Sequence, residues 1–202
     1  MIKFNQRYHP FEDLKNLSTS VRLDWIFRMV LLGLSLQMLL SFSLWFVPNG
    51  VLPYLPIFFT EGQWLEQSSQ ILFPVFLILI ILNLLYPLRR SFLALLFLTG
   101  ILLIFGNIHR LQVWFYFYGL ILFLFFWRDK VSSENMLIII PGIIVGVYLW
   151  SGLHKFNINF VNDIFPWLLE PLGWNTSAGL AYVAAGIELL IGIGLLLSLI
   201  HI

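Results

Sequence analysis

The stretch that decides the fold is AGLAYVAAGIELLIGIGLLLSLI, residues 178–200. It is apolar almost throughout, and Glu188 is its only charged residue. A helix that crosses the hydrocarbon core of a bilayer needs roughly 20 such residues. Membrane strands would alternate polar and apolar side chains, and lipid tolerates no unpaired backbone groups. The stretch therefore predicts a membrane-spanning α-helix.

Five other runs approach the same length. With the first, they place helices at about 25–47, 71–88, 91–107, 112–128, 137–154 and 178–200. The whole chain is 60% hydrophobic and 10% charged, whereas an ordinary soluble domain is about 25% charged. We therefore predict an all-α, polytopic transmembrane helical bundle of about six spans in one domain, 25–202, preceded by a segment 1–24. The third and fourth runs are short for spans.

Composition also excludes several functions. The formal net charge is +1, so no basic excess points to nucleic acid. The absence of cysteine excludes disulfides and thiolate metal sites. No Ser/His/Asp set, glycine-rich phosphate loop or His and carboxylate spacing is present, so we predict no metal site. The N-terminus does not have the features of a cleavable signal peptide.

Basic residues give the orientation. If the N-terminus is cytoplasmic, the inner side carries Lys3, Arg7, Lys15, Arg22, Arg89, Arg90, Arg128 and Lys130, with Arg28 just inside the first helix, and the outer side carries only Arg110 and Lys155. This asymmetry follows the positive-inside rule. It predicts a cytoplasmic segment 1–24 and external loops at 48–70 and 155–177.

The loop 155–177 mixes apolar residues with Asn and Asp. We expect it to be an interfacial amphipathic segment with Trp167 and Trp174 at headgroup level, broken into short pieces by Pro166 and Pro171. The last helix differs from the other inner helix ends, because no basic flank follows it before Ile202. This difference predicts a fragment or an unusually short member of its family.

Glu188 is the only acid inside a predicted span, near the middle of the bilayer. Ionisable groups are costly at that depth, so each needs a reason. One interpretation is a proton carrier or the counter-ion of a buried base. The other is a protonated or paired glutamate that locks two helices together.

Two basic dipeptides, His109-Arg110 and His154-Lys155, fall at the outer ends of predicted helices. With Asn157 close by in sequence, they could converge on one site at the same depth, which would favour an anion or a deprotonated ligand. The alternative is binding of headgroup phosphates or anchoring at the interface.

Helix packing has weaker signals. Gly142 and Gly146 form a GxxxG spacing, and Ala181 and Ala185 are spaced similarly, so we expect the fifth and sixth helices to pack closely. The aromatic run 114–118 is interpreted as a packing or interface feature, with quinone stacking as the alternative.

The segment Ser151-Gly152-Leu153-His154-Lys155-Phe156-Asn157 resembles the vitamin K-dependent γ-carboxylase family and its bacterial relatives, the HTTM (horizontally transferred transmembrane) proteins. Phe117-Tyr118-Gly119-Leu120 is similar to the family's Tyr-Gly-Leu stretch, and Gly186-Ile187-Glu188 to its later acidic helix. The resemblance covers roughly 107–200. DoxX and MauE-type membrane proteins have a similar Gly-x-x-Lys and Glu arrangement.

The resemblance implies that Lys155 is a base that deprotonates a quinone-like or vitamin K-like hydroquinone at the outer face, with His154 and Glu188 as further catalytic candidates. Arg110, His109 and Asn157 are then ligand-binding candidates. A lysine base needs desolvation or cationic neighbours, which a partly buried site beside His154 and Arg110 would provide.

These 202 residues contain no large lumenal domain such as the carboxylase uses for its protein substrate, so protein carboxylation is not expected. We expect a bacterial inner-membrane protein, enzymatic or part of an enzyme. The alternative is a non-catalytic DoxX-like subunit that binds a membrane or extracytoplasmic protein, or lipids, through the same helices.

Overall fold

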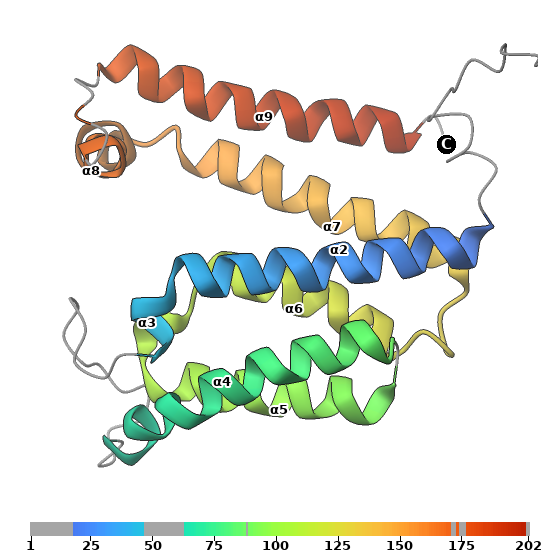
Figure 1. Cartoon of the computed structure of the whole chain (residues 1–202). Helices are drawn as coiled ribbons and strands as arrows, with labels where there is room; N and C mark the ends of the chain where they lie inside the picture. The colour runs from blue at the N-terminus through green and yellow to red at the C-terminus, as the bar shows by residue number, and fades with distance from the viewer. Residues whose placement is uncertain (1–17, 47–62, 88, 171–172, 174–176, 201–202) are drawn as a thin grey trace, which may run out of the picture. The chain divides into compact units, whose positions relative to one another are not determined.

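The computed structural model describes residues 18–46, 63–87, 89–170, 173 and 177–200, and every regular element in these ranges is a helix (Figure 1). The chain divides into two compact units, Met1–Glu134 and Asn135–Ile202. Most of the predicted segment 1–24, most of the loop 48–70, and Pro171 and Trp174 lie outside the described residues. The all-helical prediction is confirmed for the described part of the chain.

The first unit contains five α-helices and a 3-10 turn among its described residues. They are α2 (Thr19–Leu40), α3 (Phe42–Phe46), α4 (Gln63–Leu85), α5 (Arg90–Gly106), η1 (Ile108–Arg110) and α6 (Val113–Phe126). The helices α4 and α5 form a hairpin, and α6 packs against α2 and α5. Long apolar runs without proline explain α5 and α6.

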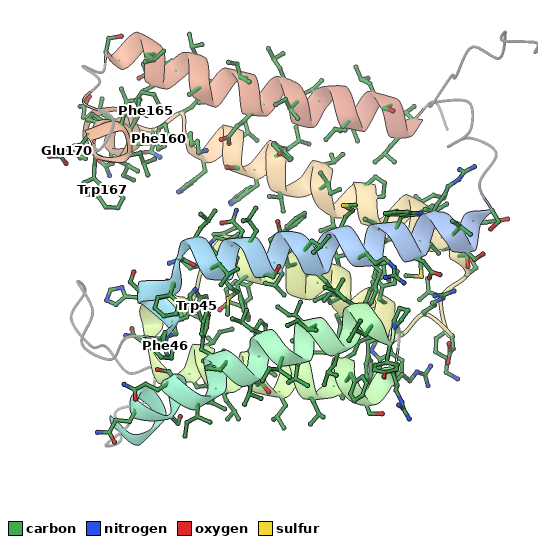
Figure 2. All side chains as sticks on the ribbon, in the orientation of Figure 1. Trp45, Phe46, Phe160, Phe165, Trp167 and Glu170 are labelled. Carbon is green, nitrogen blue, oxygen red and sulfur yellow. The ribbon has the colours of Figure 1, made fainter. Side chains whose placement is uncertain are left out.

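Several aromatic side chains of this unit pack against one another. Trp45 is fully buried (labelled in Figure 2) and stacks on Phe115, with 5.1 Å between ring centroids. Phe115 also lies 5.9 Å from Phe76, and Trp114 lies 5.7 Å from Trp45. The packing interpretation of the aromatic run is therefore confirmed for Trp114 and Phe115.

The first predicted helix, 25–47, is wrong at its start and in its continuity. The helix α2 begins at Thr19 and ends at Leu40, and α3 follows after Ser41. The Ser41 hydroxyl donates to the Gln37 carbonyl oxygen at 2.6 Å and accepts from Trp45 Nε1 at 2.9 Å. A serine that bonds to its own backbone competes with the helix and favours a break there.

The second predicted helix, 71–88, also begins earlier than expected. The helix α4 starts at Gln63 and continues through Pro74. Residues 63–70 are mostly polar, so no apolar run marks this extension in the sequence. A proline inside a helix removes one backbone hydrogen bond but does not always end the helix.

The second unit contains α7 (Ser133–His154, whose first two residues belong to the first unit), the π-helical segment η2 (Phe160–Ile164), α8 (Phe165–Leu169) and α9 (Ala178–Ile200). The helices α7 and α9 run alongside each other, and Figure 1 views α8 end-on beside the start of α9. The short segment η2–α8 therefore lies across the two long helices. This crossing direction is the one expected for a segment that lies in the membrane plane beside two membrane-spanning helices.

The prediction that Pro166 breaks this segment is wrong. The helix runs from η2 into α8, and Pro166 lies in the first turn of α8. The Phe165 backbone N–H donates to the Phe160 carbonyl oxygen across the junction, so the helix continues there. A proline inside a helix removes one backbone donor but does not always end the helix.

Among the described residues, four helices are long and apolar enough to cross a membrane: Thr19–Leu40, Gln67–Leu85, Ser133–His154 and Ala178–Ile200. The helices α5 and α6 are apolar but shorter, at 17 and 14 residues. Helices thus occur at all six predicted positions, and four of them have the length and composition of spans. This is the architecture of an integral membrane protein.

Candidate functional site

Two glycines bring α7 and α9 into close contact. A Cβ atom at Gly152 would lie 2.7 Å from the Leu189 backbone nitrogen, and one at Gly192 would lie 2.9 Å from the Leu149 nitrogen. Gly142 and Gly146 have no such neighbour within 4 Å. The predicted close packing of these two helices is therefore correct, but the GxxxG pair chosen for it is wrong. Close approach of membrane helices depends on where small residues meet another backbone, not on their spacing alone.

This contact places the side chains of Lys155 and Glu188 together. The Lys155 ammonium forms an ion pair with Oε1 of Glu188, and the Ser151 hydroxyl donates to Oε2 at 2.8 Å. The Lys155 and Glu188 side chains are 27% and 30% exposed. The cluster is thus half-buried, joins two helices, and satisfies both carboxylate oxygens.

The segment η2–α8 covers one side of this cluster. Lys155 Nζ lies 5.6 Å from the centre of the Phe160 ring, a cation–π distance. Phe160 packs with Val161, Phe165 and Ala181, so the segment is attached to the first turn of α9 (Figure 2). Trp167, on the same short helix, is 67% exposed. The apolar side of the segment therefore faces the cluster and α9.

The two long helices are staggered, and the stagger explains the pairing. Lys155 directly follows the last residue of α7, whereas Glu188 lies ten residues after Ala178, which is roughly 15 Å along α9. The end of α7 thus meets the middle of α9. The pairing favours the counter-ion and helix-locking interpretations of Glu188.

Asn157 and His154 are not part of the Lys155–Glu188 ion pair. The Asn157 amide nitrogen donates to the His154 carbonyl oxygen, and its amide oxygen accepts from the Phe160 backbone nitrogen at 2.8 Å. Asn157 thus caps both the end of α7 and the start of the next helical segment. The His154 side chain is exposed.

Arg110 and His109 belong to the first unit, and Arg110 is fully buried there. Its Nε donates to the Leu44 carbonyl oxygen at 2.9 Å, and its Nη1 to the Leu103 carbonyl oxygen at 3.1 Å. His109 is part-buried and its backbone is held by the Asn107 side chain. Arg110 therefore connects α5 to the end of α3. Its convergence with Lys155, which belongs to the other unit, stays a prediction.

Sequence reasoning missed one member of the cluster. Ser151 is part of the motif that includes Lys155, but its role follows only from the contact with Glu188. The available signal was its spacing: Ser151 lies four residues before Lys155, which is one helical turn away on the same face. Within the described ranges, no group of three or more histidine, aspartate or glutamate side chains could hold a metal ion.

Chemically, the cluster combines an ammonium, a carboxylate and a hydroxyl in a half-buried setting. Pairing reduces the cost of holding charges in an apolar medium. A lysine and a glutamate in contact can also pass one proton between them without changing the net charge. The cluster can thus either join helices or move a proton.

The fold and the cluster together define a class: an all-helical integral membrane protein with a lysine–glutamate pair between two long apolar helices. No family model, curated protein or solved structure matches the chain. The resemblance to the carboxylase-like family accordingly stays a prediction.

Proposed function

We propose that this chain is a six-span protein of the bacterial inner membrane, with a cytoplasmic N-terminus, resembling the membrane half of the γ-carboxylase and HTTM proteins. Its proposed activity is proton abstraction from a lipid-soluble, quinone-like substrate, with Lys155 as the base. The single observation that carries this proposal is the Lys155–Glu188 ion pair with its Ser151 hydrogen bond.

Side-chain exposure supports α5 and α6 as the two additional spans. Outward-facing residues on both helices are large and apolar, including Leu98, Ile101, Leu120 and Phe123. A helix that is apolar on its exposed face needs lipid or protein beside it. At 14 residues α6 is about 21 Å long, so the proposal includes local thinning of the bilayer or contributions from the flanking turns.

Ion pairs of the first unit support the orientation. Arg90 pairs with Asp129, and Arg128 pairs with Asp24, so the start of α5, the end of α6 and the start of α2 share one end of this unit. Arg110 lies at the other end of this unit, where it contacts the last turns of α3 and α5. Basic residues gathered at one end are typical of the cytoplasmic side.

The proposed chemistry begins with the ion pair. In that state Lys155 holds the proton, so it must first pass the proton to the Glu188 carboxylate to become a neutral amine. The amine then takes the hydroxyl proton of the hydroquinone, which leaves a hydroquinone anion beside the Lys155 ammonium. Ser151 holds the Glu188 carboxyl group in place during both steps.

The experiment uses vesicles that contain the purified chain and a short-chain hydroquinone, with oxygen consumption as the readout. The hydroquinone anion reacts with oxygen faster than the neutral form, so a base should raise the rate. We expect Lys155→Arg to abolish the increase, because guanidinium stays protonated. Lys130→Arg, the same change at an exposed lysine, is the matched control and should keep it.

A non-catalytic, DoxX-like subunit is the second candidate, because the ion pair is complete and a purely structural connection between α7 and α9 would look the same. In that case the wild type would give no increase in oxygen consumption, or Lys155→Arg would retain it. Either result would replace the enzymatic proposal with the structural one.

Topology has its own test, since the chain has no cysteine. Single cysteines at Gln63 and Asn175 should react with an impermeant thiol reagent added outside intact cells, whereas one at Lys130 should react only after lysis. The reverse pattern would overturn the orientation.

A further inference from the structure

A cavity of about 270 Å³ lies between α5 and α6 in the first unit. Its floor includes Leu96, Gly100 and Leu122, which are buried, and its mouth includes Tyr116, Leu120 and Phe123, which are about half exposed. The remaining lining is also apolar. The cavity therefore opens sideways from the helices through a hydrophobic mouth.

Gly119 on α6 keeps this space open. A Cβ at Gly119 would meet no heavy atom within 4 Å, although the residue lines the cavity. At Gly100, in the floor of the cavity on α5, a Cβ would lie 3.1 Å from both Phe115 and Phe76. Apolar cavities of this kind do not hold water and accept apolar ligands.

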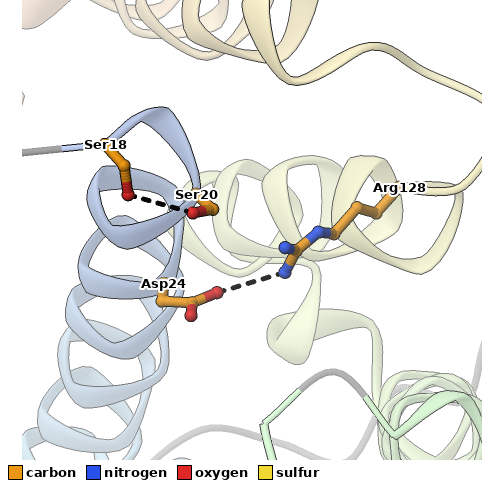
Figure 3. A network of polar contacts seen from close by, with 4 residues as sticks. All are labelled: Ser18, Ser20, Asp24 and Arg128. Atoms are coloured by element: carbon orange, nitrogen blue, oxygen red, sulfur yellow. Dashed lines mark hydrogen bonds and ion pairs between the residues drawn. The ribbon is translucent and has the colours of Figure 1, made fainter.

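Basic side chains gather at one end of the same two helices. Arg89 directly precedes α5, and Lys130 follows α6 by four residues. The nearby Arg90 pairs with Asp129, and Arg128 pairs with Asp24 at 3.1 Å. Figure 3 draws the Arg128–Asp24 pair. Arg89 and Lys130 are exposed, and neither has a carboxylate partner among the residues that the structure describes. This end thus has positive charge beyond what its own acids neutralise.

The cavity lies at the depth of acyl chains below this basic end. Phe97, in the cavity wall, is seven residues after Arg90, which is roughly 10 Å along the helix. The headgroup region on each side of a bilayer is roughly 5–8 Å thick. A molecule with its phosphate at the basic end would therefore place a hydrocarbon chain at the level of the cavity.

We propose that the first unit binds one anionic phospholipid, with an acyl chain in the α5–α6 cavity and its phosphate at Arg89 and Lys130. Charge complementarity selects the anionic headgroup, and the apolar lining selects the chain. This site is independent of Lys155, so its failure would leave the proposed function untouched.

The test measures lipid binding to the purified full chain in detergent by native mass spectrometry. The probes are phosphatidylglycerol and phosphatidylcholine with identical acyl chains. We expect phosphatidylglycerol to bind more tightly, and the double variant Arg89→Gln/Lys130→Gln to weaken it by about thirtyfold. Gly119→Leu, which fills the cavity, should weaken it by at least about tenfold. Gly146→Leu, where a Cβ also has open space, is the matched control and should leave binding unchanged.

A phosphatidylglycerol with a photoreactive group near the end of its acyl chain tests the wild type directly, in case Gly119→Leu does not fold. It should label peptides of α5 and α6. The proposal is overturned if the two lipids bind equally, if Gly119→Leu binds like Gly146→Leu, or if the probe labels other helices. It is also overturned if an isoprenoid quinone occupies the cavity and phosphatidylglycerol cannot displace it.

Discussion

Arg110 in the first unit and Lys155 in the second are both basic side chains at helix ends, but they are held in different ways. Arg110 is fully buried, and the contacts described above are with backbone carbonyl oxygens of Leu44 and Leu103. Lys155 is 27% exposed and pairs with the carboxylate of Glu188. Arg110 links two backbone segments through its guanidinium, which stays protonated, whereas Lys155 is paired with an acid that can accept its proton.

This difference separates a structural cation from a candidate catalytic one. Carbonyl oxygens do not take up a proton near neutral pH, and guanidinium does not release one. Lysine and glutamate can both change protonation state, and both remain partly accessible here. The chemistry of the partner therefore tells more about function than the cost of placing a charge in the membrane.

The largest effect is expected for Arg110→Ala. The change removes the hydrogen bonds to the Leu44 and Leu103 carbonyl oxygens and opens a cavity, so the free energy of unfolding should fall by about 3–5 kcal/mol. Thermal unfolding in detergent measures it. The control is Arg90→Ala. The Arg90 and Asp129 side chains are 52% and 69% exposed, so their ion pair should contribute less than about 1 kcal/mol. Equal losses for the two variants would contradict the structural role of Arg110.

An intermediate effect is expected for Gly152→Ala. The added Cβ would lie 2.7 Å from the Leu189 backbone nitrogen, so α9 must move, at a cost of about 1–3 kcal/mol. The movement should also separate Lys155 from Glu188 and lower any activity. Gly146→Ala has open space and should be neutral or slightly stabilising. If both variants were as stable as the wild type, the close contact between α7 and α9 would be wrong.

The smallest effect is expected for the coupling between Lys155 and Glu188. A double-mutant cycle with Lys155→Met and Glu188→Gln should give a coupling of about 1–2 kcal/mol in the free energy of unfolding. The more exposed Arg90–Asp129 pair provides the comparison and should couple by less than about 1 kcal/mol. A coupling free energy near zero between Lys155 and Glu188 would contradict the ion pair in the proposed site.

Helix positions could be predicted well where the apolar run itself set the boundary. The bounds of α9 agree with the predicted 178–200, and those of α5 agree within one residue. Predictions failed at the starts of α2, α4 and α7, where polar residues extend the helix, and at Ser41, where a serine ends α2. Hydropathy detects contact with lipid, whereas these boundaries depend on local hydrogen bonds.

The candidate site was predictable only in part. Lys155 and Glu188 stand out in the sequence because ionisable residues are rare in apolar runs. Their partnership with Ser151, and the capping role of Asn157, follow from contacts that cross between helices or close a turn. The choice of Gly142 and Gly146 failed because spacing does not say which glycines meet a neighbouring backbone.

The sequence by itself determined that the chain contains long apolar helices, with one conspicuous charge, Lys155, at the end of the fifth and another, Glu188, in the middle of the sixth. The reason is that side-chain polarity along a helix reports the medium around it. Only the tertiary structure decided that the end of α7 meets the middle of α9. That stagger depends on Gly152 and Gly192 fitting against the partner backbone, forty residues apart in the chain. Packing between distant residues therefore turned two isolated charges into one site.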